Sequence, residues 1–293
     1  MSATKDVVAL NDWYVVAFTG EIAKGHSEIT RLLSQDIVIH RDWSGSFHCV
    51  TLPEDGEDER SLETCEKYGF LWVTLGKPAR EIVKIPEFEG KERKFVHRGR
   101  IGVPTSGQRV IENFFDLSHF SFVHTGTLGG YDSAEVPRYS VEFREEETEL
   151  WATGCSFYQP KASAAAGVST TVYYDYRIPS PFISIIYKDS LVQRGSKDLI
   201  GLFIQPHDEE RCTVHSFALV YDERNNQTHI LHFYHEIFAQ DRSILIHQLP
   251  KKLPISPRRE IPTISDASST PWPTSSASAS PPPSCPTSGA CSS

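Results

Sequence analysis

The 293-residue sequence has no apolar run close to the roughly 18 residues that a membrane-spanning helix requires. Its lysines and arginines form no dense cluster and its net charge is −9, which argues against binding to a nucleic-acid backbone. The N-terminus has neither the basic start nor the long apolar core of a secretion signal. Its six cysteines fit no disulfide framework. We therefore expect a cytoplasmic protein with reduced thiols and no membrane association.

The sequence does contain a succession of short strands followed by one long helix. Runs of β-branched and aromatic residues between turn residues predict strands at 36–40, 68–76, 139–144, 149–157, 169–178, 181–188, 198–206 and 211–221. Residues 226–248 contain no Gly or Pro and repeat apolar residues every three or four positions, which predicts a long amphipathic helix. The expected fold class is α+β, an antiparallel sheet closed by a long C-terminal helix.

Changes in composition divide the chain into three parts. Polar segments at 53–64 and 89–94 flank an apolar run, so we expect a β-rich region over residues 1–95 and a second domain over 96–262. The last part, 263–293, is dominated by Ser and Pro and has little to bury, so we predict that it is disordered. A reading-frame shift near Thr263 would produce the same abrupt change.

The segment 112–124 concentrates side chains that can bind a metal ion. Within these thirteen residues stand one Glu, one Asn, one Asp and two His. Imidazole and carboxylate together suit a borderline divalent cation. Two His and one carboxylate on one face leave three coordination positions open, the arrangement used by ferrous oxygenases. The composition of the segment therefore favours a metal centre.

The spacing of the two histidines sets a condition on that centre. His119 and His124 are five residues apart, which is about 140° around a regular helix and too wide for one ion. They can share a metal only if the helix kinks or ends between Phe120 and Phe122. Without such a break they would be surface or capping histidines of an amphipathic helix, and spacing alone leaves that choice open.

Residues 113–129, NFFDLSHFSFVHTGTLG, resemble the mononuclear iron motif N-x2-D-x2-H-x4-H of the Rieske non-haem iron oxygenases. The resemblance is greatest to the branch of vanillate O-demethylases and methylxanthine N-demethylases. Three more segments match in order: 11–22 resembles the family's opening strand, 68–76 the strand after its cluster domain, and 237–248 the helix that carries the third ligand. The resemblance implies a helix-grip catalytic domain over 96–262, after a β-rich remnant of a Rieske domain.

The resemblance also implies roles for five residues. His119 and His124 correspond to the imidazole ligands of Fe(II), and Asp241 to the carboxylate ligand. Asp116 corresponds to a carboxylate that hydrogen-bonds a ligating His and faces the incoming electrons. Asn113 corresponds to a polar residue that shapes the pocket. From the residues alone, Asp241 is as readily a solvated charge on a helix.

Family members normally carry an N-terminal Rieske domain whose 2Fe-2S cluster is held by a C-x-H…C-x2-H pattern. Cys49 and Cys65 match its cysteines, but Thr51 and Tyr68 stand where the histidines are required. Two thiolates cannot hold that cluster, so we expect none on this chain. The simplest explanation is a deletion of the cluster-bearing loops, bridged by residues 53–64.

The chain thus looks most like the Rieske-less subunit of bacterial caffeine-type N-demethylase complexes. By that resemblance, Fe(II) and O2 hydroxylate a methyl group of a small N- or O-methylated aromatic such as a methylxanthine, which then releases formaldehyde. The electrons come from an external 2Fe-2S centre and an NAD(P)H-dependent reductase on a partner chain that docks near Asp116. Aromatic residues of the predicted sheet are candidates for a flat pocket: Phe157, Tyr173, Tyr174, Tyr176, Phe182, Phe203 and Phe217.

Two other functions stay open. The chain could be a non-catalytic subunit that positions a full-length oxygenase; loss of the cluster fits this, whereas five intact site residues argue against it. It could also be a metal-free small-molecule binder, because closed sheets often enclose ligands. The methylated aromatic, the methyl position and the choice between a homo-oligomer and a hetero-oligomer are not specified by the sequence.

Overall fold

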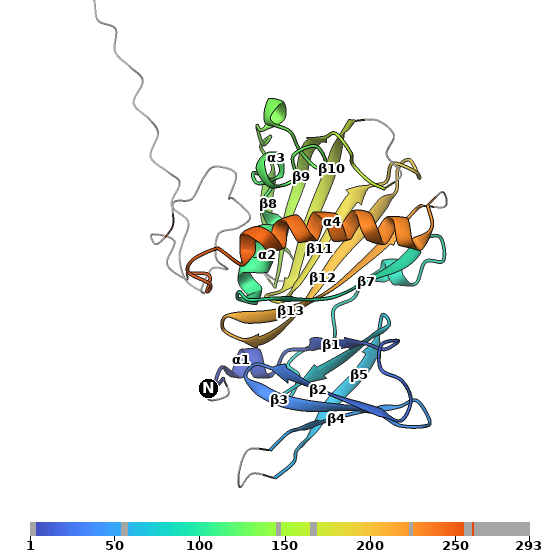
Figure 1. The fold of residues 1–293 in the computed structure, drawn as a ribbon, viewed down its shortest axis with the longest axis vertical. Coiled ribbons are helices and arrows are strands. Elements are labelled where there is room, and N and C mark those ends of the chain that lie inside the picture. The colour runs from blue at the N-terminus through green and yellow to red at the C-terminus, as the bar shows by residue number, and fades with distance from the viewer. Residues whose placement is uncertain are drawn as a thin grey trace, which may run out of the picture.

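A computed structural model describes residues 4–53, 58–144, 148–164, 169–222, 225–254 and 260. Two antiparallel sheets and one long helix make up most of this part of the chain (Figure 1). The segment 263–293, predicted to be disordered, lies outside the described residues. None of the helices in the described ranges is both long and apolar enough to cross a membrane.

The N-terminal sheet has six strands in the order β1-β6-β5-β4-β3-β2. After the short helix α1 (Val7–Leu10), its strands are β1 (Tyr14–Phe18), β2 (His26–Leu32), β3 (Gln35–Arg41), β4 (Phe47–Thr51), β5 (Ser61–Lys67) and β6 (Phe70–Thr74). The predicted connection 53–64 is therefore partly wrong. Its last residues begin β5, because Glu63 and Thr64 pair with β6 and so satisfy their backbone groups in the sheet.

The second sheet has seven strands in the order β7-β13-β12-β11-β10-β9-β8. They are β7 (Lys94–Val103), β8 (Ser140–Arg144), β9 (Glu149–Gln159), β10 (Thr170–Ser180), β11 (Ile183–Asp189), β12 (Lys197–Asp208) and β13 (Arg211–Val220). The six strands predicted after residue 138 are confirmed to within two residues at each end. The sequence pattern does not predict β7, because the strand begins in the polar segment 89–94 and has polar side chains on both of its faces.

The helices lie around this second sheet. They are the 3-10 turns η1 (Pro86–Phe88) and η2 (Tyr131–Ser133) and the α-helices α2 (Gly107–Phe115), α3 (Phe120–Val123) and α4 (Gln227–Leu245). Helix α4 crosses one face of the sheet (Figure 1), and the N-terminal sheet packs against side chains of its other face. This confirms the predicted α+β plan with its long C-terminal helix.

The two faces of the second sheet have separate hydrophobic cores. Under α4, the core combines helix residues such as Phe238 with strand residues such as Tyr174. Between the sheets, Phe203 and Phe217 pack with Phe70 and Trp72 of the N-terminal sheet. Nearly every residue of β12 is buried, since the strand is covered on both faces.

Candidate metal centre

The two histidines of the motif flank a single helical turn. Helix α2 ends at Phe115, because Asp116 adopts an extended conformation and its Oδ1 accepts hydrogen bonds from both the N–H and the hydroxyl of Ser118 at 2.7 and 2.6 Å. His119 then caps the start of α3 and His124 caps its end. The chain is therefore interrupted before His119 and again at His124, and not between Phe120 and Phe122 as predicted.

Asp241 reaches the same place from α4. The buried residues of this helix form an apolar stripe in which Asp241 stands between Phe238 and Leu245, at spacings of three and four. Asn226 starts the helix, its side-chain oxygen accepting the N–H of His229 at 2.9 Å. A carboxylate on an apolar stripe faces the interior and requires a partner there. This position is the signal, visible in the sequence, that separates Asp241 from a solvated helix charge.

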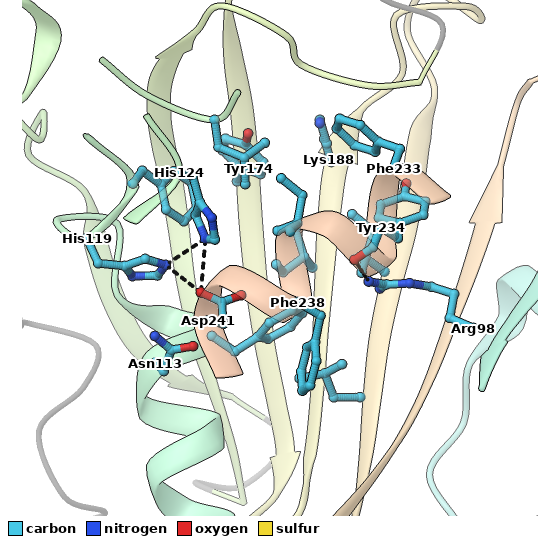
Figure 2. Close-up of a pocket in the computed structure, with 17 residues that line it drawn as sticks. Arg98, Asn113, His119, His124, Tyr174, Lys188, Phe233, Tyr234, Phe238 and Asp241 are labelled. Atoms are coloured by element: carbon cyan, nitrogen blue, oxygen red, sulfur yellow. Dashed lines mark hydrogen bonds and ion pairs between the residues drawn. The ribbon is translucent and has the colours of Figure 1, made fainter. Parts of the chain in front are cut away.

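Three ligand atoms converge at one point (Figure 2). His119 Nε2 lies 3.1 Å from His124 Nε2 and 3.2 Å from Asp241 Oδ1, and His124 Nε2 lies 3.0 Å from Asp241 Oδ1. Ligands about 2.1 Å from one ion stand about 3.0 Å apart at right angles and about 3.4 Å apart in a tetrahedron. The separations therefore fit one face of an octahedron, which leaves three positions open.

The chemistry of these groups also fits a cation. Asp241 Oδ1 is buried, and no hydrogen bond to it is formed within the described residues, although both imidazole nitrogens are near. No other group of three or more His, Cys, Asp or Glu in the described ranges brings its ligand atoms together for a metal. The predicted ligand set is thus assembled, and its donors suit Fe(II).

The pKa shifts of His119 and Asp241 also indicate that positive charge is favoured at this site. Burial opposes charge on His119, but contacts with Asp116 and Asp241 raise the pKa of His119 to about 9. Burial likewise opposes charge on Asp241, yet His119 and His124 hold the pKa of Asp241 below its usual range. The two carboxylates thus favour positive charge beside them, and a bound divalent ion would supply that charge in place of a proton on His119.

Two further side chains orient the imidazoles. Asp116 Oδ2 lies 3.4 Å from His119 Nδ1, an ion pair that is too long for a well-aligned hydrogen bond. Gln240 Oε1 lies 2.8 Å from His124 Nδ1 and, as the acceptor, fixes the hydrogen there, so that the lone pair of Nε2 points at the centre. The role of Gln240 is not predicted above. The signal in the sequence for it is that Gln240 directly precedes the candidate ligand Asp241.

We expect Gln240→Ala to weaken Fe(II) binding by about 10- to 100-fold, because His124 loses the partner that sets its tautomer and ring orientation. The dissociation constant from anaerobic Fe(II) titration measures this. Gln240→Glu keeps an acceptor at the same place and should retain most of the affinity. Glu236→Ala, which removes an exposed side chain of the same helix, should change nothing. Equal affinity in Gln240→Ala and the wild type would show that His124 is oriented without Gln240.

A largely apolar cavity adjoins the three residues. Its aromatic lining consists of Phe114, Phe120, Tyr174, Phe233, Tyr234 and Phe238. Of the seven aromatic residues expected to form a pocket, only Tyr174 lines this one. Side chains alternate between the faces of a strand, so Tyr173 is exposed while Phe203 and Phe217 face the N-terminal sheet.

Asn113 and Asp116 occupy different sides of the centre. Asn113, on α2, lies beside Asp241 and His119 in Figure 2 and lines the cavity. Asp116 does not line it and approaches the His119 ring from the far side, at Nδ1. Asn113 thus lies towards the pocket and Asp116 lies behind a histidine.

The N-terminal sheet places its two cysteines apart. Cys49 packs into the core on one face of the sheet, and its neighbour across the strands is Leu62, in the same core. Cys65 stands three residues further along β5, so it faces the opposite side and packs against the core between the sheets. The described residues of this sheet therefore offer no paired thiolates for a Rieske cluster.

Comparisons with known proteins agree with this arrangement. The Vanillate O-demethylase oxygenase C-terminal domain family matches residues 94–272. "Probable methylxanthine N7-demethylase NdmC" of Pseudomonas sp. (strain TJI-51) is 40% identical over 258 residues, which cover 88% of this chain and 90% of that protein. "Methylxanthine N1-demethylase NdmA" of Pseudomonas putida is 25% identical over 199 residues, which cover 64% of this chain and 53% of that protein.

Solved structures share the fold. The structure of NdmA from Pseudomonas putida CBB5 with caffeine superposes with a TM-score of 0.73 at 16% identity, over 89% of this chain and 88% of that one. The family match covers more than half of the sequence and the identity to NdmC extends over most of it. The chain therefore belongs to the Rieske non-haem iron oxygenase family, as a catalytic oxygenase subunit of the vanillate O-demethylase type, and its described residues offer no paired thiolates for a Rieske cluster.

Proposed function

We propose that this chain is the oxygenase component that removes a methyl group from a small methylated aromatic, with Fe(II) held by His119, His124 and Asp241. The observation that carries the proposal is the convergence of these three ligand atoms, 3.0 to 3.2 Å apart, at the wall of an apolar cavity. The names of the relatives support an N-methylated xanthine as the substrate, and the 40% identity to a protein named for N7-demethylation points to the N7 methyl group.

The ferrous ion would supply the activation of O2. The overall reaction inserts one oxygen atom into a C–H bond of the methyl group and reduces the other to water, with two electrons and two protons. The N–C bond of the resulting N–CH2OH group then breaks, the carbon leaves as formaldehyde, and the nitrogen takes the proton of the hydroxyl group. The aromatic walls of the cavity hold a planar ring and exclude water from it.

The electrons must come from a partner, because Cys49 and Cys65 lie on opposite faces of their sheet. We propose that a 2Fe-2S centre on a Rieske-bearing partner, itself reduced by an NAD(P)H-dependent reductase, docks on the side of Asp116. That carboxylate keeps 23% of its side-chain surface exposed and touches His119. A cytoplasmic hetero-complex, in which this chain binds the substrate and a partner chain supplies the electrons, fits this proposal.

The purified protein is expected to bind about one Fe(II) per chain. With O2, NADH and a Rieske-bearing reductase, it should release one formaldehyde for each 7-methylxanthine consumed. Metal analysis and formaldehyde assays measure the two quantities. An iron-loaded chain that binds methylxanthines but never releases formaldehyde would instead identify a non-catalytic subunit, and a wild-type chain that takes up no iron would rule out the oxygenase.

A further inference from the structure

A buried arginine faces the cavity without enough acceptors. The side chain of Arg98 is only 4% exposed and lines the cavity. Its Nη2 donates to the carbonyl oxygen of Tyr234 at 3.2 Å, and the guanidinium lies 4.2 Å from the centre of the Tyr234 ring. Its Nε and Nη1 are buried, and neither finds an acceptor among the described residues. Figure 2 shows Arg98 entering the cavity from the side opposite His119.

A β-bulge aims Arg98 into the cavity. In the pairing of β7 with β13, His97 faces Phe217 and Arg100 faces His215, so Arg98 and Gly99 share a single partner position. Gly99 has a φ of +80°, a conformation that glycine adopts readily.

The extra residue reverses the alternation of β7. His97 and Arg100 are three residues apart, yet both approach Glu21 in the N-terminal region, at 3.9 and 3.6 Å. Arg98 remains on the α4 side, where His235 holds its carbonyl oxygen at 2.7 Å. The bulge thus places the side chains of Arg98 and Arg100 on opposite faces of the sheet.

The energetics of this position require an explanation. Burial lowers the pKa of Arg98 to about 10, so the guanidinium remains charged at neutral pH. No carboxylate forms an ion pair with Arg98 within the described residues. The charge of Asp241 raises the pKa of Arg98 from a distance, but Asp241 itself contacts His119 and His124. Buried donors without acceptors are unfavourable, and a ligand that enters the cavity with an acceptor oxygen would satisfy them.

A second cation lines the same cavity. Lys188 is 5% exposed, and its Nζ donates to the carbonyl oxygen of Ala162. Once an iron ion neutralises Asp241, the remaining polar lining carries positive charge. Such a cavity favours an electron-rich ring with oxygen acceptors and disfavours an aromatic amine.

We propose that Arg98 determines substrate specificity by donating hydrogen bonds to an oxygen on the aromatic ring, and so sets which edge of the ring faces the metal centre. The inference rests on the proposed function, because it takes the cavity as the substrate site. Two kinds of oxygen share this chemistry, the lactam carbonyl of a methylxanthine and the carboxylate of a vanillate-like acid.

Equilibrium binding to the iron-loaded protein, without O2 or reductant, tests the proposal with two matched pairs of ligands. 7-Methylxanthine is compared with 7-methylpurine, which lacks the carbonyls, and vanillate with guaiacol, which lacks the carboxylate. The wild type should prefer the oxygen-bearing member of one pair by about 10- to 100-fold. The pair that shows the preference identifies the kind of oxygen.

Arg98→Met should remove this preference by weakening the oxygen-bearing member and leaving the other within about twofold. Arg98→Lys, which keeps the charge, should recover part of it. Arg100→Met is the matched control on the same strand and should keep the wild-type preference. Thermal melts and iron content of each variant establish that it is folded and loaded.

The proposal is overturned if the wild type shows no preference in either pair, or if Arg98→Met affects both members equally. These outcomes are separable from failure of the proposed function, because binding is measured without turnover. Formaldehyde release together with an unchanged preference in Arg98→Met would refute the role of Arg98 alone. Preserved discrimination in a chain that never releases formaldehyde would refute the reaction alone.

Discussion

Replacing Asp241 by alanine is expected to abolish iron binding and all turnover. Asp241 supplies the one carboxylate among the three converging groups, and its Oδ1 lies within 3.2 Å of both imidazole nitrogens. Two neutral imidazoles alone cannot balance the charge of a divalent ion in a buried site. After anaerobic loading and desalting, iron should fall from about one per chain to below about 0.1.

The control for Asp241→Ala is Glu236→Ala, which removes an exposed carboxylate from the same helix and should leave the iron content unchanged. A thermal melt of the two metal-free proteins establishes that α4 still packs, since Phe238 and Leu245 hold its buried face in both. Retention of iron by a folded Asp241→Ala protein would place the ion elsewhere and make this carboxylate a structural partner of the histidines.

Phe203→Ala is expected to lower the free energy of unfolding by about 3–5 kcal/mol. Phe203 is 1% exposed, and its ring centre lies 4.8 Å from that of Trp72, 4.9 Å from Phe217 and 5.2 Å from Phe70. The substitution removes the ring that joins the two sheets and leaves a cavity between them. Urea denaturation followed by circular dichroism measures the loss as a lower midpoint.

Tyr173→Ala serves as the comparison, because this aromatic residue of β10 is 54% exposed. Its effect should be within about 0.5 kcal/mol. If Phe203→Ala destabilises the protein no more than Tyr173→Ala does, polar contacts such as Gln205 with Thr30, at 2.8 Å, must hold the sheets together instead.

The sequence predicts best those strands that consist mostly of β-branched and aromatic residues. From β8 to β13, β-branched and aromatic residues dominate, and the predicted ranges agree closely with the structure. β7 is not predicted, because it begins in the polar segment 89–94 and because Arg98 and Arg100 place charge on opposite faces of the strand. Each of these side chains is accommodated by partners distant in the sequence, such as Glu21 and Tyr234, which no local pattern contains.

The site was predicted in composition more fully than in geometry. His119 and His124 stood out, but the position of the chain break depends on Asp116, whose side chain competes with the helix for the N–H of Ser118. Asp241 is marked by its place on an apolar stripe. Gln240 and Arg98 could not be predicted, because their roles arise only when α4 packs against the sheet and against His124.

The position of Asp116 behind His119 has a consequence for the order of events. The cavity adjoins the Nε2 side of that imidazole, whereas Asp116 meets the Nδ1 side. If electrons enter through Asp116, the donor protein and the substrate approach opposite edges of one ring and do not compete for the same surface. A ternary complex can then form in either order, and the donor can stay docked while the product leaves.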